Sequence, residues 1–140
     1  CRGGSDFETS ALDLARFGHL YLNKGVWNGL QLLSQEWVQM ATTNQVPPNI
    51  IHEEEHRSGS DGRAIYGYNF WVRGDSLKDA RDMPDTPPGT YYTSGYNNNM
   101  CFIIPEWNMV FVRMGLDGNP AEGKRYVYNI FFRELAKALH

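Results

Sequence analysis

The stretch YYTSGYNNNMCFIIPEWNMVFVR, residues 91–113, decides the fold of this chain. It contains three short runs rich in aromatic and β-branched residues, at about 91–95, 99–104 and 109–114, and this composition is typical of strands. The segment Pro105-Glu106-Trp107-Asn108 separates the last two runs and predicts a turn. Because short turns join neighbouring strands that run in opposite directions, the stretch predicts an antiparallel sheet.

Helical patterns lie on both sides of this stretch. Ser10 is a candidate N-cap, Asp13 falls in the favourable first turn, and apolar residues then recur at helical spacing until Gly25. Ser34 predicts the start of a second helix, and residues 124–139 predict a third. The apolar stripe expected on the third helix consists of Val127, Ile130, Phe131, Leu135 and Ala138.

Further local signals complete the expected architecture. The Asn28-Gly29 pair lies between apolar residues and predicts a tight hairpin, because a type I′ turn needs positive φ at both central positions. Residues 66–73 are aromatic-rich and predict another strand, whereas 44–65 and 74–90 are expected to be variable loops. Together the patterns predict an α+β fold, in which helices flank an antiparallel sheet, and a single domain spanning the chain.

The bulk composition excludes several classes of protein. The 140 residues carry a net charge of −3 without a basic stripe, so no nucleic-acid partner is expected. No apolar run approaches the roughly 18 residues that a membrane span needs. The two cysteines indicate no disulfide framework, and Cys101 is predicted to be a buried free thiol. The chain opens at Cys1-Arg2-Gly3-Gly4, which favours a fragment of a longer protein and leaves the cell compartment open.

Five segments carry a pattern that extends over most of the chain. They are Ser10–Gly25, Trp27–Gly29, Gln31–Val38, Tyr66–Val72 and Ser94–Arg113. The pattern resembles the class C β-lactamase-like family of serine hydrolases, which includes penicillin-binding DD-peptidases, carboxylesterases and amide hydrolases. The resemblance implies the C-terminal portion of a β-lactamase/transpeptidase-like fold, from an enzyme that cleaves ester or amide bonds, β-lactams among them.

The family's catalytic motifs are only partly present. Members use a Ser-x-x-Lys for nucleophile and base, a Tyr-x-Asn for proton transfer, and a strand motif of Lys or His, then Thr or Ser, then Gly. No Ser-x-x-Lys occurs in this chain, so it holds no catalytic residue of its own and is expected to be inactive alone. Thr93-Ser94-Gly95 is the counterpart of the strand motif.

The resemblance implies a role for each residue of this segment. Ser94 would hydrogen-bond the substrate, Gly95 would let the substrate approach the strand closely, and the Tyr96 backbone N–H would form half of an oxyanion hole. Thr93 stands where the family usually has a cation. That departure favours an ester or amide substrate over β-lactam or peptidoglycan chemistry.

Two other functions compete with a hydrolase fragment. His52-Glu53-Glu54-Glu55-His56 matches the H-E-x-x-H zinc motif, but the nearby Pro47-Pro48 and Ser58-Gly59 leave room for one short turn only. A solvated acidic loop is expected there instead, with no metal and no cofactor. The chain could also be a stand-alone, non-catalytic binding module, and its exposed strand edges favour a homo-oligomer.

Overall fold

The computed structural model describes residues 7–50, 63–73, 83–115 and 127–139. The helices are α1 (Ala11–Leu22), α2 (Gln35–Ala41) and α3 (Val127–Ala138). The strands are β1 (Val26–Trp27), β2 (Leu30–Gln31), β3 (Trp71–Val72), β4 (Tyr91–Gly95), β5 (Asn99–Ile104) and β6 (Met109–Arg113). Short 3₁₀ turns, η2 (Tyr96–Asn98) and η3 (Pro105–Trp107), join the last three strands. The predicted α+β class is confirmed.

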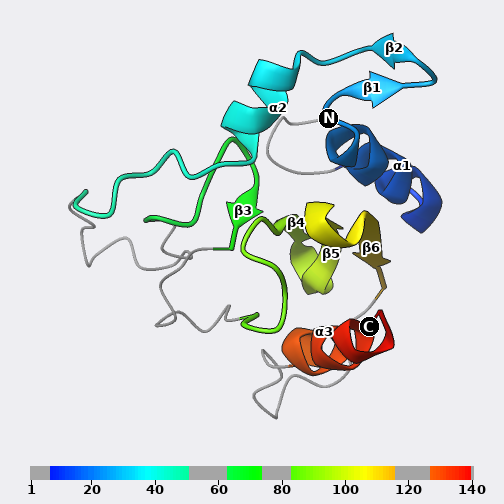
Figure 1. Cartoon of the computed structure of the whole chain (residues 1–140), viewed down its shortest axis with the longest axis vertical. Coiled ribbons are helices and arrows are strands. Elements are labelled where there is room, and N and C mark those ends of the chain that lie inside the picture. Colours follow the sequence, from blue (N-terminus) through cyan, green and yellow to red (C-terminus); the bar gives the residue numbers. More distant parts are fainter. Residues whose placement is uncertain (1–6, 51–62, 74–82, 116–126, 140) are drawn as a thin grey trace.

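The main sheet has four antiparallel strands in the order β3-β4-β5-β6, and β1 and β2 form a separate hairpin. Figure 1 shows this sheet between α1 and α2 on one side and α3 on the other. β4, β5 and β6 follow one another through short turns, so each lies beside its sequence neighbour, whereas residues 73–90 connect β3 to β4. The three strands predicted between residues 91 and 114 are confirmed, with boundaries that differ by one residue at most.

Two hydrophobic clusters lie on opposite faces of the sheet, because successive side chains of a strand point to opposite faces. The α1-side cluster consists of Leu14, Tyr21, Val38, Ala41, Phe70, Tyr91, Cys101 and Ile103. The α3-side cluster consists of Met83, Tyr92, Met100, Phe102, Ile104 and Phe132. β5 supplies residues to both clusters and is buried on both faces, so it is the central strand of the core.

The capping and turn signals of the sequence are confirmed. The Ser10 hydroxyl oxygen accepts a hydrogen bond from the Asp13 N–H at 3.1 Å and caps α1. Ser34 caps α2 in the same way. The Asn28-Gly29 pair has φ angles of 48° and 78°, as the predicted type I′ hairpin between β1 and β2 requires.

The strand predicted over residues 66–73 is too long. Only Trp71–Val72 is a strand, because the chain turns sharply just before it. The Gly67 N–H donates to the Phe70 carbonyl at 2.8 Å, and Asn69 lies in the left-handed region with φ of 61°. An aromatic-rich composition therefore indicated a strand where a local turn interrupts the sheet.

The predicted apolar stripe of α3 is confirmed at Leu135, which packs on the α3-side cluster, and is wrong at Ile130 and Phe131. Ile130 and Phe131 are 57% and 41% exposed, whereas Phe132 is fully buried. The helix packs on the sheet through Tyr128, Phe132 and Leu135, which recur at helical spacing and surround the α3-side cluster. The buried face of α3 is therefore rotated about the helix axis relative to the predicted stripe.

A polar contact ties the segment before β4 to α3. The Asp85 carboxylate accepts hydrogen bonds from Asn129 Nδ2 at 2.7 Å and from Arg133 Nε at 2.9 Å. The Asp85 N–H donates in return to Asn129 Oδ1 at 3.1 Å. Burial of the carboxyl raises its pKa. Several interactions lower the pKa by more: the hydrogen bond from Arg133, the hydrogen bond from Asn129, and the charges of Arg133 and Lys137. The pKa of Asp85 therefore lies below its ordinary value.

This contact predicts a pH-dependent contribution to stability. A carboxyl with a lowered pKa stabilises the fold above its unfolded pKa, here about 3.8, and loses that contribution as the pH falls through the folded pKa. We expect Asp85→Asn to cost up to about 1 kcal/mol at neutral pH, the range of a partly exposed ion pair. The cost should shrink below about pH 4 in urea unfolding of both proteins. An equal loss of unfolding free energy at neutral pH and below about pH 4 would contradict a lowered pKa for Asp85.

Candidate functional site

The four residues predicted to line a substrate pocket lie together at the end of β4. The first part of this strand is buried, Thr93 is half-buried, and Ser94 and Gly95 are exposed. Tyr96 follows the strand and is 89% exposed. The strand therefore begins in the core and ends at the protein surface, where its last residues are accessible to a ligand.

The hydrogen-bonding pattern of β4 determines which backbone groups face which neighbour. The Arg73 N–H donates to the Thr90 carbonyl at 2.9 Å, so Thr90 directs its backbone groups toward the β3 side. These groups alternate along an antiparallel strand, so the Ser94 N–H points the same way and the Gly95 carbonyl points toward β5. A trans peptide unit directs its C=O and N–H oppositely, so the Tyr96 N–H points away from β5.

Among the residues that the structure describes, none pairs with these two amides on the β3 side of the sheet. β3 pairs with β4 only at Tyr91 and Tyr92. The turn before Trp71 takes the chain away from the sheet. Within the described part of the chain, no strand lies beside Ser94. The N–H groups of Ser94 and Tyr96 therefore face a side of β4 that no described strand covers.

The turn after β4 is held in place from two other elements. Asn97 and Asn98 both lie in the left-handed region, which asparagine tolerates better than most residues. Arg113 Nη1 donates to the carbonyl oxygens of Asn97, Asn98 and Gly115. The Tyr128 hydroxyl donates to the Asn98 carbonyl at 3.3 Å. β6 and α3 thus fix the geometry of the turn, and with it the position of the Tyr96 amide.

Gly95 is not required by the backbone conformation of the strand. Its φ of −116° is extended and open to any residue. A Cβ at this position would lie 3.3 Å from the Asn99 carbonyl oxygen, which is tight but not forbidding. Glycine in a strand often marks a place where a ligand approaches the backbone closely, and this exposed position fits that use.

The other reactive groups in the described part of the chain do not form a second site. Cys101 is fully buried, its thiol donates to the Leu14 carbonyl at 3.6 Å, and burial raises the pKa of the thiol to about 12. The prediction of a buried free thiol is confirmed. The acidic segment 52–56 lies outside the described residues. Within the residues that are described, no three His, Cys, Asp or Glu side chains cluster to hold a metal ion. Nor does any helix there combine the length and apolar character of a membrane span.

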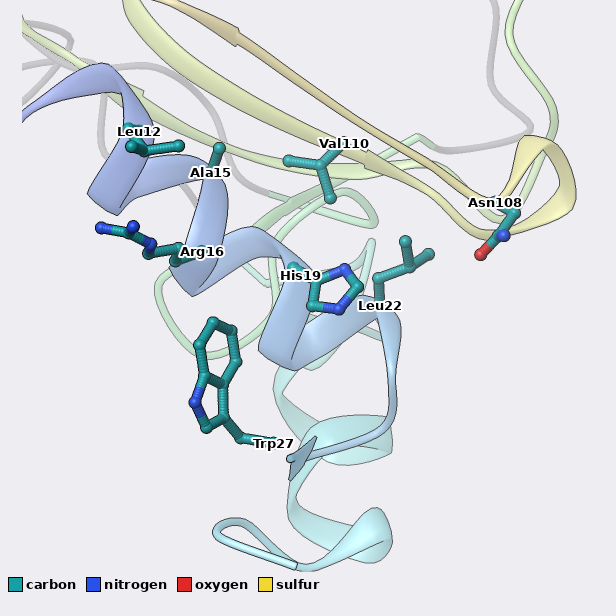
Figure 2. Close-up of a pocket in the computed structure, with 8 residues that line it drawn as sticks. All are labelled: Leu12, Ala15, Arg16, His19, Leu22, Trp27, Asn108 and Val110. Atoms are coloured by element: carbon teal, nitrogen blue, oxygen red, sulfur yellow. The ribbon is translucent and has the colours of Figure 1, made fainter. Parts of the chain in front are cut away.

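A groove of about 310 Å³ lies elsewhere, between α1, β1 and the start of β6. Figure 2 shows the residues that line it, which are Leu12, Ala15, Arg16, His19, Leu22, Trp27, Asn108 and Val110. None of residues 93–96 is among them. Sequence reasoning missed this groove, although Leu12, Ala15, His19 and Leu22 recur at helical spacing and indicate a second face of α1.

Comparison with known proteins supports the fold. No protein-family model matches the sequence. The chain is 26% identical over 121 residues to an uncharacterised protein of Alkalihalophilus pseudofirmus, and this match covers 86% of the chain and 33% of that protein. The chain therefore spans about a third of the length of this curated relative.

A solved structure from Bacillus anthracis, provisionally named a 6-aminohexanoate-dimer hydrolase, is similar over 94% of this chain and 29% of its own length. The TM-score is 0.63 and the sequence identity is 24%. The two chains share a fold over this region.

Proposed function

We propose that these residues form the C-terminal part of a serine hydrolase of the β-lactamase-like family, which cleaves ester or amide bonds by acyl transfer. The observation that carries the proposal is the exposed end of β4, where the N–H groups of Ser94 and Tyr96 face an open edge on either side of Gly95. The fold shared with a chain named as a hydrolase and the sequence resemblance both support it.

The geometry suits the charge that develops in acyl transfer. A serine oxygen forms a bond to the substrate carbonyl carbon, and the electron pair of the C=O bond moves onto the carbonyl oxygen. When the tetrahedral intermediate collapses, the bond to the leaving group breaks, and the leaving group takes up the proton released by the serine. Water then cleaves the acyl-enzyme by the same steps. The Tyr96 N–H would stabilise the oxyanion, and the Ser94 hydroxyl would orient the substrate.

The nucleophile and its base must come from outside these residues, because the chain contains no Ser-x-x-Lys. An oxyanion hole without a nucleophile retains little acyl transfer. We therefore expect the 140-residue chain to be inactive alone. The alternative function, a non-catalytic binding module, would also leave the chain inactive, so activity of the chain alone does not separate the two.

The wall formed by β4 favours an uncharged substrate. Thr93, Ser94 and Gly95 carry no charge. Arg113, which contacts the turn after β4, is bound to three backbone carbonyl oxygens. Proteins commonly bind carboxylates through Arg or Lys side chains, and this wall presents neither to a ligand. Neutral esters and amides fit it better than substrates that carry a carboxylate beside the scissile bond.

Covalent labelling tests the proposal directly. We expect a fluorophosphonate probe, which reacts with activated serines, to label the full-length protein that contains this segment but not the 140-residue chain. The full-length protein should also hydrolyse a short-chain p-nitrophenyl ester in preference to a chromogenic cephalosporin. Heat-denatured full-length protein is the control, because it retains every serine without the active site.

The outcomes separate the competing functions. A full-length protein that the probe does not label would refute the hydrolase, and a cooperative melt of the isolated chain would then favour the binding module. Labelling of the 140-residue chain itself would place the nucleophile within these residues.

A further inference from the structure

The turn after β4 has a backbone conformation that local sequence alone does not stabilise. Asn97 and Asn98 are consecutive residues in the left-handed region, with φ of 57° and 54°. This region is sterically costly for residues that carry a Cβ, and asparagine reduces the cost without removing it. The β4–β5 ladder ends at the pair of Gly95 and Asn99, so the carbonyl groups of the turn need partners from elsewhere.

Arg113 provides these partners from the end of β6. Its Nη1 donates to the Asn97 carbonyl, to the Asn98 carbonyl at 3.2 Å and to the Gly115 carbonyl at 3.1 Å. The Arg113 residue is half-buried. Hydrogen bonds from a charged donor are stronger than neutral ones, and water weakens them less at a half-buried position. One nitrogen atom therefore draws together carbonyl oxygens of two separate segments.

Gly115 is tied to the same turn through both of its backbone groups. Its N–H donates to Asn99 Oδ1 at 2.8 Å, and its carbonyl accepts from Arg113. Its φ of 120° favours glycine, although nothing lies within 4 Å of the place that a Cβ would take. The glycine is therefore needed for the backbone conformation and not for space. We call Arg113 and Gly115 together the β6 brace.

The β6 brace holds a group that lies close to the Tyr96 amide along the chain. Because peptide units are planar, only the torsion angles of Tyr96 and Asn97 connect the Tyr96 N–H to the Asn97 carbonyl. The sheet register fixes the chain just before this point, at Gly95. A catalytic group misplaced by about 1 Å can cost about 10²-fold in rate. Loss of the brace would therefore displace the Tyr96 N–H enough to matter in catalysis.

We propose that Arg113 is a positioning residue for the oxyanion hole, which holds the Tyr96 N–H in place by binding the carbonyl oxygens of the turn. This role rests on the proposed hydrolase function, because the oxyanion forms only in that reaction. Arg113 acts through the backbone and does not contact the substrate. Its charge thus has a use beside a pocket wall that is itself uncharged.

Arg113→Met in the full-length protein tests this role, because it removes the charge and the donors and keeps an unbranched apolar stem. We expect kcat for a short-chain p-nitrophenyl ester to fall about 10–100-fold, while KM stays within about twofold. Rates are expressed per active site, counted by labelling with a fluorophosphonate to completion, so that unfolded protein does not lower them. Arg133→Met is the matched control. Arg133 pairs with Asp85 at 2.9 Å instead, and its loss should leave kcat unchanged.

Two further variants separate positioning from a general loss of structure. Arg113→Lys should recover part of the lost kcat, because the oxygens converge on one nitrogen and a lysine ammonium also carries several donors. In a protein that already carries Tyr96→Pro, Arg113→Met should lower kcat by no more than about twofold, because the N–H that it positions is gone. Losses that multiply in the double variant would show that Arg113 acts by another route and would overturn the proposal.

Gly115→Ala keeps the proposal testable if Arg113→Met does not fold. The added methyl group meets no neighbouring atom, but it disfavours the φ of 120° and so loosens the brace without removing a charge. We expect kcat per active site to fall, and the loss to disappear in the Tyr96→Pro background.

The outcomes distinguish this role from the hydrolase function on which it rests. An active native protein whose kcat is unchanged by Arg113→Met, or by Gly115→Ala where the first variant does not fold, would overturn the role of Arg113 alone. A native full-length protein that the fluorophosphonate does not label would overturn both.

Discussion

Replacing Phe132 with alanine is expected to lower the free energy of unfolding by about 3–5 kcal/mol, the range for truncating a buried phenylalanine. Phe132 is fully buried in the α3-side cluster. Its ring contacts Phe102 edge-on with centroids 4.9 Å apart, and it contacts Phe111 at 5.8 Å. Small domains have total stabilities of about 5–15 kcal/mol, so this single change would remove a large share.

Phe131→Ala is the matched control, because it truncates the same side chain one position earlier on the same helix. Phe131 is partly exposed and packs mainly on Phe111, so we expect a cost of only about 1 kcal/mol. Urea unfolding of the two variants and the native chain measures the difference. Equal costs, or a larger cost for Phe131→Ala, would contradict the orientation of α3 and favour the stripe that the sequence pattern indicated.

Replacing Tyr96 with proline in the full-length protein is expected to lower kcat by about 10²–10³-fold, the loss measured when one oxyanion-hole donor is removed. Proline is the one natural residue that removes a backbone N–H. Tyr96 is the first residue of a 3₁₀ turn, and the preceding Gly95 is extended with φ of −116° and ψ of 173°. Both conformations accept proline at position 96, so the change should remove the donor without refolding the turn.

Tyr96→Ala is the matched control, because it removes the exposed ring and keeps the N–H. If the amide stabilises the oxyanion, Tyr96→Ala should retain most of kcat and Tyr96→Pro should not. Melting curves of both variants check that the fold is intact. A proline variant with unchanged kcat would show that the oxyanion is bound elsewhere, even if the protein remains a serine hydrolase.

The candidate site was largely predictable as a segment, because its residues are contiguous. Thr93, Ser94, Gly95 and Tyr96 lie on one strand end, so identifying the strand was enough to bring them together. The open side beside them was not predictable. It depends on where β3 begins, and β3 begins only at Trp71 because Asn69 and the hydrogen bond from the Gly67 N–H to the Phe70 carbonyl turn the chain just before it.

The groove beside β6 could not be predicted from the sequence for a similar reason. Its walls come from a helix, a hairpin and a strand that are distant along the chain. A helical repeat of Leu12, Ala15, His19 and Leu22 indicates a face but does not say what that face meets. Only the packing of α1 on β6 places Val110 opposite that face.

Signals that act over a few residues were sufficient for the local structure. Ser10 caps α1, Asn28-Gly29 closes the first hairpin, and the aromatic and β-branched runs between 91 and 113 form three strands, because these signals depend on neighbouring residues. The buried face of α3, the length of β3 and the uncovered edges depended on the tertiary structure. They are decided by contacts such as that between Asp85 and Asn129, 44 positions apart, and such contacts become favourable only once the chain has brought distant surfaces together.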